Sequence, residues 1–213
     1  MSARCNILLA VSAAVAAGGC GDISNPSRSS NFYDWRLVVG IDSLTFSWPQ
    51  GTAVRVWVQD TLNMAAHTQA GIDTWKEQFL YGEFDAVLVA DSAAADVLVG
   101  VSIPPAAVRA IRLGSMAPEC TGETTFPPLA GSTIVLPFHI RVLPRTLDPE
   151  GAATQGCLGL TVTHELGHAM GLFKHSPDAN DLMFTDPVSG PSTRDRNTVQ
   201  QLYHFEADLT ASR

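Results

Sequence analysis

The stretch that decides the fold is Thr163–Met183, which reads THELGHAMGLFKHSPDANDLM. Its histidines His164 and His168 are four residues apart, so on a helix they share one face, one turn apart. Two imidazole nitrogens arranged in this way can bind one metal ion, and neutral imidazole suits zinc. Glu165 comes next to the first histidine, where its carboxylate can take a proton from a metal-bound water molecule and pass it to a leaving amine. The pattern HExxH therefore predicts a catalytic zinc site on a helix.

The residues after this helix offer a third metal ligand, which a catalytic zinc site needs. Gly171 can adopt a positive φ and end the helix with a sharp turn, so that the chain returns toward the metal. His175 lies just beyond this turn, and we expect it to be the third ligand, with Asp178 or Asp181 as the alternatives. Met183 follows His175 at a distance of eight residues.

These residues resemble the motif of the metzincin zinc metallopeptidases, and of their matrixin-like branch in particular. His164, Glu165, His168 and Gly171 stand at the motif positions, and Met183 matches the methionine of the family's Met-turn, a hydrophobic base under the zinc. The resemblance implies a zincin-like fold, one catalytic Zn²⁺, and a zinc-dependent endopeptidase that hydrolyses peptide bonds with Glu165 as general base and acid.

The chain departs from the family pattern at one position. The usual HExxHxxGxxH would place the third histidine at residue 174, where this chain has Lys174, and His175 follows one residue later. A protonated ammonium cannot bind zinc, whereas a loop absorbs a one-residue insertion. The displaced histidine favours an alternative function, a zinc-containing surface lipoprotein with a binding role and vestigial activity, whereas the presence of Glu165 favours an enzyme.

The remaining sequence predicts an α/β or α+β sandwich, in which one twisted, mixed β-sheet packs against about three helices. Alternating and helical spacings of apolar residues predict the elements. Two β-rich runs around a Pro-Gln-Gly turn are expected within 44–58, and further strands at 84–90, 95–103 and 132–143. One helix is expected at 61–79, with Asp60 and Thr61 as its cap, and a second helix is expected to end near residue 172. A last helix is expected to start at the capping box Ser192-x-x-Asp195. The segment 104–128 is expected to be irregular.

The composition excludes several classes of protein. The chain has 213 residues, of which 46% are hydrophobic and 16% charged, so it is neither a disordered tract nor a multi-span membrane protein. A formal net charge of −8 argues against a nucleic-acid binder.

No loop matches a calcium-binding signature, so structural calcium is unsupported. We expect a monomer whose partners are protein or peptide substrates.

The first nineteen residues read as an export signal. Arg4 precedes the apolar run Ile7–Ala17, which is too short to span a bilayer but suits a secretory signal peptide. The run leads into Ala-Gly-Gly-Cys ending at Cys20, which resembles the bacterial lipobox and implies that Cys20 is lipidated and becomes the new N-terminus. An ordinary cleaved signal peptide is the alternative.

A lipid on Cys20 would anchor the protein without spanning the membrane. Residues 20–34 are then the lipidated cysteine and a flexible tether, and residues 35–213 form the metallopeptidase domain. We therefore expect an exported cell-envelope lipoprotein, on the periplasmic or cell-surface side of a bacterial membrane.

The remaining cysteines and histidines have simpler interpretations. Cys120 and Cys157 are expected to form a disulfide, as cysteine pairs in exported domains usually do, with a thiolate ligand or nucleophile as the alternative. We expect His67 to face solvent on the first helix, His139 to be an ordinary strand residue rather than a second metal ligand, and His204 to belong to the last helix.

Overall fold

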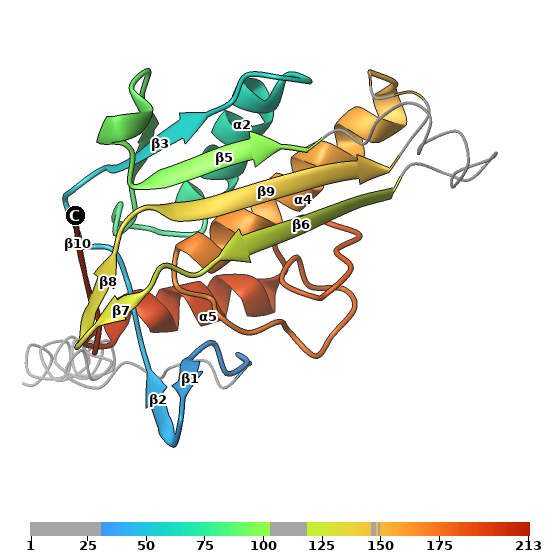
Figure 1. Ribbon diagram of the computed structural model, residues 1–213. Coiled ribbons are helices and arrows are strands. Elements are labelled where there is room, and N and C mark those ends of the chain that lie inside the picture. Colours follow the sequence, from blue (N-terminus) through green and yellow to red (C-terminus); the bar gives the residue numbers. More distant parts are fainter. Residues whose placement is uncertain (1–30, 103–118, 146–147, 149) are drawn as a thin grey trace, which may run out of the picture. The chain divides into compact units, whose positions relative to one another are not determined.

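The computed structural model describes residues 31–102, 119–145, 148 and 150–213 (Figure 1). The predicted signal peptide, Cys20 and most of the predicted tether lie outside these residues. The described compact unit covers Asn31–Arg213, and Tyr33 and Trp35 near its start are buried. Among the helices of the described part, none is long and apolar enough to cross a membrane.

A five-stranded mixed sheet is the largest element of this unit, and its strand order is β4-β3-β5-β9-β6. Four strands run parallel, and β6 pairs antiparallel with β9 at one edge. Inward-facing residues alternate with outward-facing ones along β3, β5 and β9, as a sheet with one face in the core requires. The strands are β3 (Val54–Val58), β4 (Ala86–Leu88), β5 (Val97–Val101), β6 (Glu119–Thr125) and β9 (Phe138–Arg145).

The described residues also form two smaller sheets and a short 3-10 helix, η1 (Ser92–Ala94). An antiparallel hairpin consists of β1 (Leu37–Val39) and β2 (Asp42–Leu44), and a three-stranded sheet consists of β7 (Leu129–Ala130), β8 (Thr133–Val135) and β10 (Thr210–Ser212). The single strand expected at 132–143 was wrong, because β8 and β9 belong to different sheets. Pro137 separates them, since proline has no N–H to donate to a neighbouring strand.

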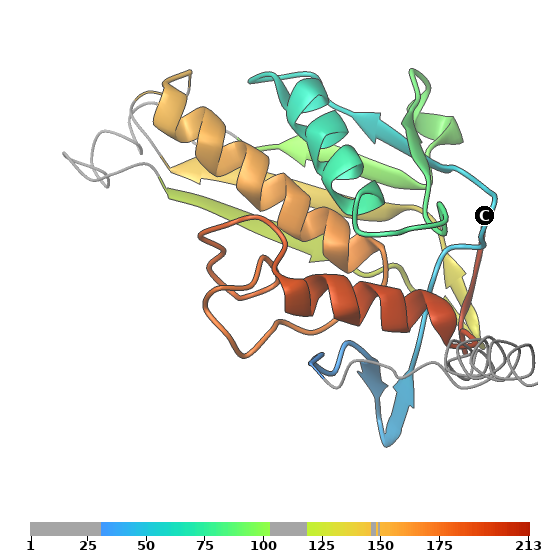
Figure 2. The same ribbon diagram turned by 180° about the vertical axis from the view of Figure 1, so that it is seen from behind.

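The described residues contain three α-helices: α2 (Met64–Lys76), α4 (Ala152–Ala169) and α5 (Thr193–His204), of which α2 and α4 contact strands of the large sheet. Helices α2 and α4 lie side by side on one face of the sheet (Figures 1 and 2). Gly71 lets them approach closely, because a Cβ there would lie 2.9 Å from the Thr163 hydroxyl. Trp75 joins the same interface, since its indole N–H donates to the Thr163 carbonyl at 2.8 Å. Within the described residues, these elements confirm an α+β class with mixed sheets and three helices. The expectation of one sheet was wrong, because the strands form three separate sheets.

The helix ends differ in part from the expected ones. Helix α2 begins at Met64 rather than residue 61, and its N-cap is Asn63, in the left-handed region, rather than Asp60. Helix α4 ends at Ala169, close to the expected residue 172. The capping box of α5 is confirmed, because Ser192 and Asp195 exchange the expected hydrogen bonds.

Strand β6 is the main element that the sequence did not predict. Residues 104–128 were expected to be irregular, yet Glu119–Thr125 (ECTGETT) pairs with β9 over its whole length. The strand has no apolar alternation, which is the usual signal for a half-buried strand. The disulfide between Cys120 and Cys157 is confirmed, and it joins β6 to α4. Residues 103–118 lie outside the described part.

Candidate metal centre

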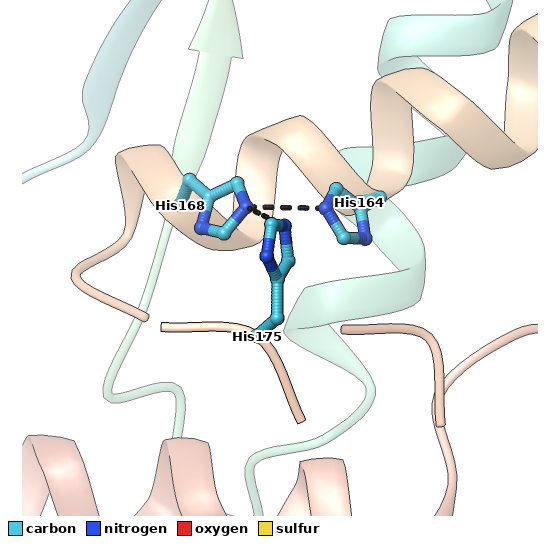
Figure 3. Close-up of side chains that lie close together, drawn as sticks. All are labelled: His164, His168 and His175. Atoms are coloured by element: carbon cyan, nitrogen blue, oxygen red, sulfur yellow. Dashed lines mark hydrogen bonds between the residues drawn. The ribbon is translucent and has the colours of Figure 1, made fainter. Parts of the chain in front are cut away.

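Three imidazoles converge at the C-terminal end of α4 and the loop that follows (Figure 3). The Nε2 atom of His168 lies 3.1 Å from that of His164 and 3.2 Å from that of His175. Two nitrogens that bind one zinc ion at about 2.0–2.1 Å in tetrahedral geometry lie roughly 3.3 Å apart. The three nitrogens therefore fit a single metal ion, and His175 joins the group despite its displaced position in the sequence.

The other ring nitrogens of the two helical histidines are fixed by backbone carbonyls. His164 Nδ1 lies 2.7 Å from the Leu182 oxygen, and His168 Nδ1 lies 2.5 Å from the Leu172 oxygen. A carbonyl only accepts, so each Nδ1 carries the proton and each Nε2 keeps a free lone pair. Both imidazoles are thus held in the tautomer that binds a metal.

The turn after α4 brings His175 back to the helix. Gly171 adopts φ 115°, and a Cβ at this position would lie 2.1 Å from the Phe46 carbonyl oxygen. Only glycine therefore fits this turn without a backbone shift. Lys174 does not join the metal group, because its ammonium pairs with Asp34 at 2.5 Å.

The two aspartates that were the alternative third ligands have other partners. Both Asp178 and Asp181 form ion pairs with Arg194, and the buried Asp181 also accepts hydrogen bonds from Ser176 and Ser192. Within the described part of the chain, the metal-binding group consists of the three histidines alone. The loop carboxylates therefore lie outside the candidate metal group, and their contacts with Arg194 link the loop to α5.

The loop around Met183 is tied both to α5 and to the metal ligands. The carboxylate of Asp195, fully buried, accepts hydrogen bonds from the backbone N–H groups of Leu182 at 2.8 Å and Met183 at 3.4 Å. The Leu182 carbonyl is in turn the partner of His164, so one peptide unit links α5 to a metal ligand. Met183 is fully buried, and a Cβ on Gly167 would lie 2.5 Å from its sulfur. The methionine thus packs under the last turns of α4.

Glu165 faces the same cleft as two of the histidines. A cleft of about 330 Å³ is lined by Glu165, His168 and His175 together with residues of β6. Burial raises the pKa of Glu165 to about 7, while a hydrogen bond from Thr124 acts in the opposite direction. A carboxylate with a pKa near neutrality is suited to accept and return a proton. Thr124 belongs to β6, so the sequence analysis did not identify it.

Burial also keeps the imidazoles neutral. It lowers the pKa of His164 to about 4 and of His168 to about 3, and it lowers that of His175 as well. Neutral imidazole is the metal-binding form, so these groups do not have to lose a proton at pH 7 before they bind a metal.

We expect the metal-free protein to lose stability as the pH falls from 6.5 toward 4.5. In the unfolded chain the imidazoles bind protons near pH 6.5, whereas His164 (pKa about 4) and His168 (pKa about 3) stay neutral in the folded state. On these two residues the unfolded state then holds more protons, so each lowers the free energy of unfolding by up to roughly 1.4 kcal/mol per pH unit. Glu165, whose pKa of about 7 makes it bind a proton in the folded state first, offsets part of this loss. Urea unfolding in EDTA at pH 6.5, 5.5 and 4.5 measures this slope.

The double variant His164→Gln/His168→Gln is the control for this pH dependence, because it lacks both titrating groups. Its unfolding free energy should change less over the same pH range. Equal slopes in the two proteins would show that other groups cause the effect.

The remaining described histidines lie outside the metal group. His67 is half-buried rather than solvent-facing, because its Nε2 lies 2.8 Å from the Gln155 side-chain oxygen. His139 is an exposed residue of β9, and His204 is the last residue of α5, as expected.

No protein-family model matches the chain, and no curated protein matches it significantly.

Proposed function

We propose that this protein is a zinc-dependent endopeptidase with a metzincin-like, matrixin-type catalytic domain. The observation that carries the proposal is the convergence of the His164, His168 and His175 imidazoles, two of which, His168 and His175, line the same cleft as Glu165. Structural zinc sites have four protein ligands, whereas three ligands leave a position open for water or substrate. A group of three histidines beside a buried carboxylate is therefore typical of a catalytic site.

The donor set fits zinc. All three ligands are imidazoles that burial keeps neutral, and the partners of the two helical ones fix the required tautomer. Zinc held there would supply a Lewis acid and would acidify a water molecule in the cleft. Glu165 then takes a proton from the attacking water and passes it to the nitrogen of the leaving amine.

The edge of the large sheet supports a role in binding an extended peptide. Within the described residues β6 pairs only with β9, so its other edge has backbone N–H and C=O groups without strand partners. An extended chain can add to such an edge through backbone hydrogen bonds. Since β6 also lines the cleft of Glu165, a bound peptide would lie across the metal site.

The direct test combines metal analysis with cleavage of a peptide library. The purified full chain should hold one zinc ion, cleave internal peptide bonds, lose this activity with a chelator and regain it with added zinc. Stoichiometric zinc without cleavage of any peptide would instead support the alternative, a surface lipoprotein with a binding role.

The proposed anchor is tested by labelled palmitate, which should appear on the wild type and not on Cys20→Ser.

A further inference from the structure

Glu165 is held by residues of β6, not only by the helix that carries it. The Thr124 hydroxyl lies 2.6 Å from the Glu165 Oε2 atom and 3.1 Å from the Glu165 backbone oxygen. The hydroxyl has one proton to donate, and the shorter distance falls in the range of hydrogen bonds from a hydroxyl to a carboxylate. Thr124 therefore fixes one oxygen of the carboxylate.

A second residue of β6 makes room for the other carboxylate oxygen. Gly122 lies two residues before Thr124, on the same face of the strand. A Cβ at residue 122 would lie 2.2 Å from the Glu165 Oε1 atom and 2.6 Å from its Cγ. Any side chain there would push the carboxylate out of its present position. The hydrogen bond from Thr124 and the space at Gly122 thus act on the two oxygens of one group.

The position of β6 relative to α4 does not depend on Thr124. The strand pairs with β9 along its whole length, and the Cys120–Cys157 disulfide joins it to α4. Glu165, by contrast, is a buried side chain, and no other side chain is found to donate a hydrogen bond to its carboxylate in the described residues. Loss of the Thr124 hydroxyl should therefore release the carboxylate and leave the strand in place.

We propose that Thr124 and Gly122 are positioning residues that aim the Glu165 carboxylate into the cleft shared with His168 and His175. This inference rests on the proposed function for its effect on catalysis. Thr124 acts through Glu165 and faces α4, whereas a peptide would bind along the edge of the strand. Its loss should therefore lower kcat and leave KM nearly unchanged.

Kinetics of the zinc-loaded full chain provide the first test. Thr124→Val keeps the shape of the side chain without the hydroxyl, and we expect it to lower kcat by about 10- to 100-fold, because displacement of a reacting group by about 1 Å can cost 100-fold. Thr124→Ser should restore kcat to within roughly 3-fold of the wild type, and Gly122→Ala should lower it like Thr124→Val. Thr210→Val, at an exposed position on β10 and outside the large sheet, is the matched control and should keep full activity.

Crystal structures of zinc-loaded wild type and Thr124→Val provide a test that does not depend on activity. The Glu165 carboxylate should have one position in the wild type, and it should move or occupy several positions in the variant. An unchanged carboxylate in Thr124→Val, or an unchanged kcat, would overturn the inference. If the wild type cleaves no peptide but the carboxylate still moves in Thr124→Val, the proposed function is wrong and the positioning contact stands.

Discussion

Glu165→Gln is expected to lower kcat by about 10²- to 10⁴-fold, the usual contribution of a general acid–base group. Glutamine has the same shape, so the buried side chain can keep its place and can still accept the hydrogen bond from Thr124. It cannot take up a proton from water at neutral pH, so the substitution removes the proton acceptor together with the negative charge. Zinc content and the melting temperature should stay close to those of the wild type, as measured by elemental analysis and circular dichroism.

Glu77→Gln is the matched control for this experiment, because Glu77 is an exposed residue at the end of α2. It makes the same change of charge and should leave kcat unchanged. Full activity of Glu165→Gln would exclude Glu165 as the general base. Loss of zinc in that variant would mean that the carboxylate supports the metal group rather than the chemistry.

His168→Ala is expected to weaken zinc binding by at least about 100-fold, since even the loss of a residue that supports a metal ligand costs 10- to 100-fold. His168 is the central ligand, because its Nε2 lies 3.1 Å and 3.2 Å from those of His164 and His175. Alanine leaves two nitrogens, too few to complete a catalytic zinc site. The expected loss of activity should therefore be matched by the loss of bound metal.

The stability that zinc adds to the folded protein measures the same loss of zinc binding without a substrate. At a free zinc concentration 1,000-fold above the wild-type dissociation constant, zinc should raise the free energy of unfolding of the wild type by about 4.1 kcal/mol. A variant that binds zinc 100-fold more weakly should gain only about 1.4 kcal/mol at the same concentration. His139→Ala is the control, because His139 is exposed on β9 and lies outside the metal group. An equal zinc-induced gain in His168→Ala and wild type would exclude His168 as a ligand.

The metal group was the part of the site that the sequence predicted best. The four-residue spacing places His164 and His168 on one face of any helix that contains them, and Gly171 marks the end of this helix. The distance of His175 from the other two depends on the path of the loop, for which the sequence offered a histidine and two aspartates. Packing decided between them, because Asp178 and Asp181 pair with Arg194 of α5.

The surroundings of Glu165 could not be predicted. Strand β6 is polar throughout, so no apolar alternation marked it, and Thr124 and Gly122 were placed in an irregular segment. They meet Glu165 only because β6 pairs with β9, and α4 packs beside both strands. Similarly, the sequence identified Asp195 as a capping residue, but not as the partner of the Leu182 and Met183 N–H groups.

The sequence by itself determined the local features of this protein: a helix with two histidines on one face, a glutamate beside them, a glycine turn and a capped last helix. These depend on residues within a few positions of one another, and short-range spacing and backbone preference are enough to specify them. The tertiary structure decided which loop residue completes the metal group and what holds the carboxylate. Those contacts join residues far apart in the chain, and they exist only after the sheet and helices have packed together.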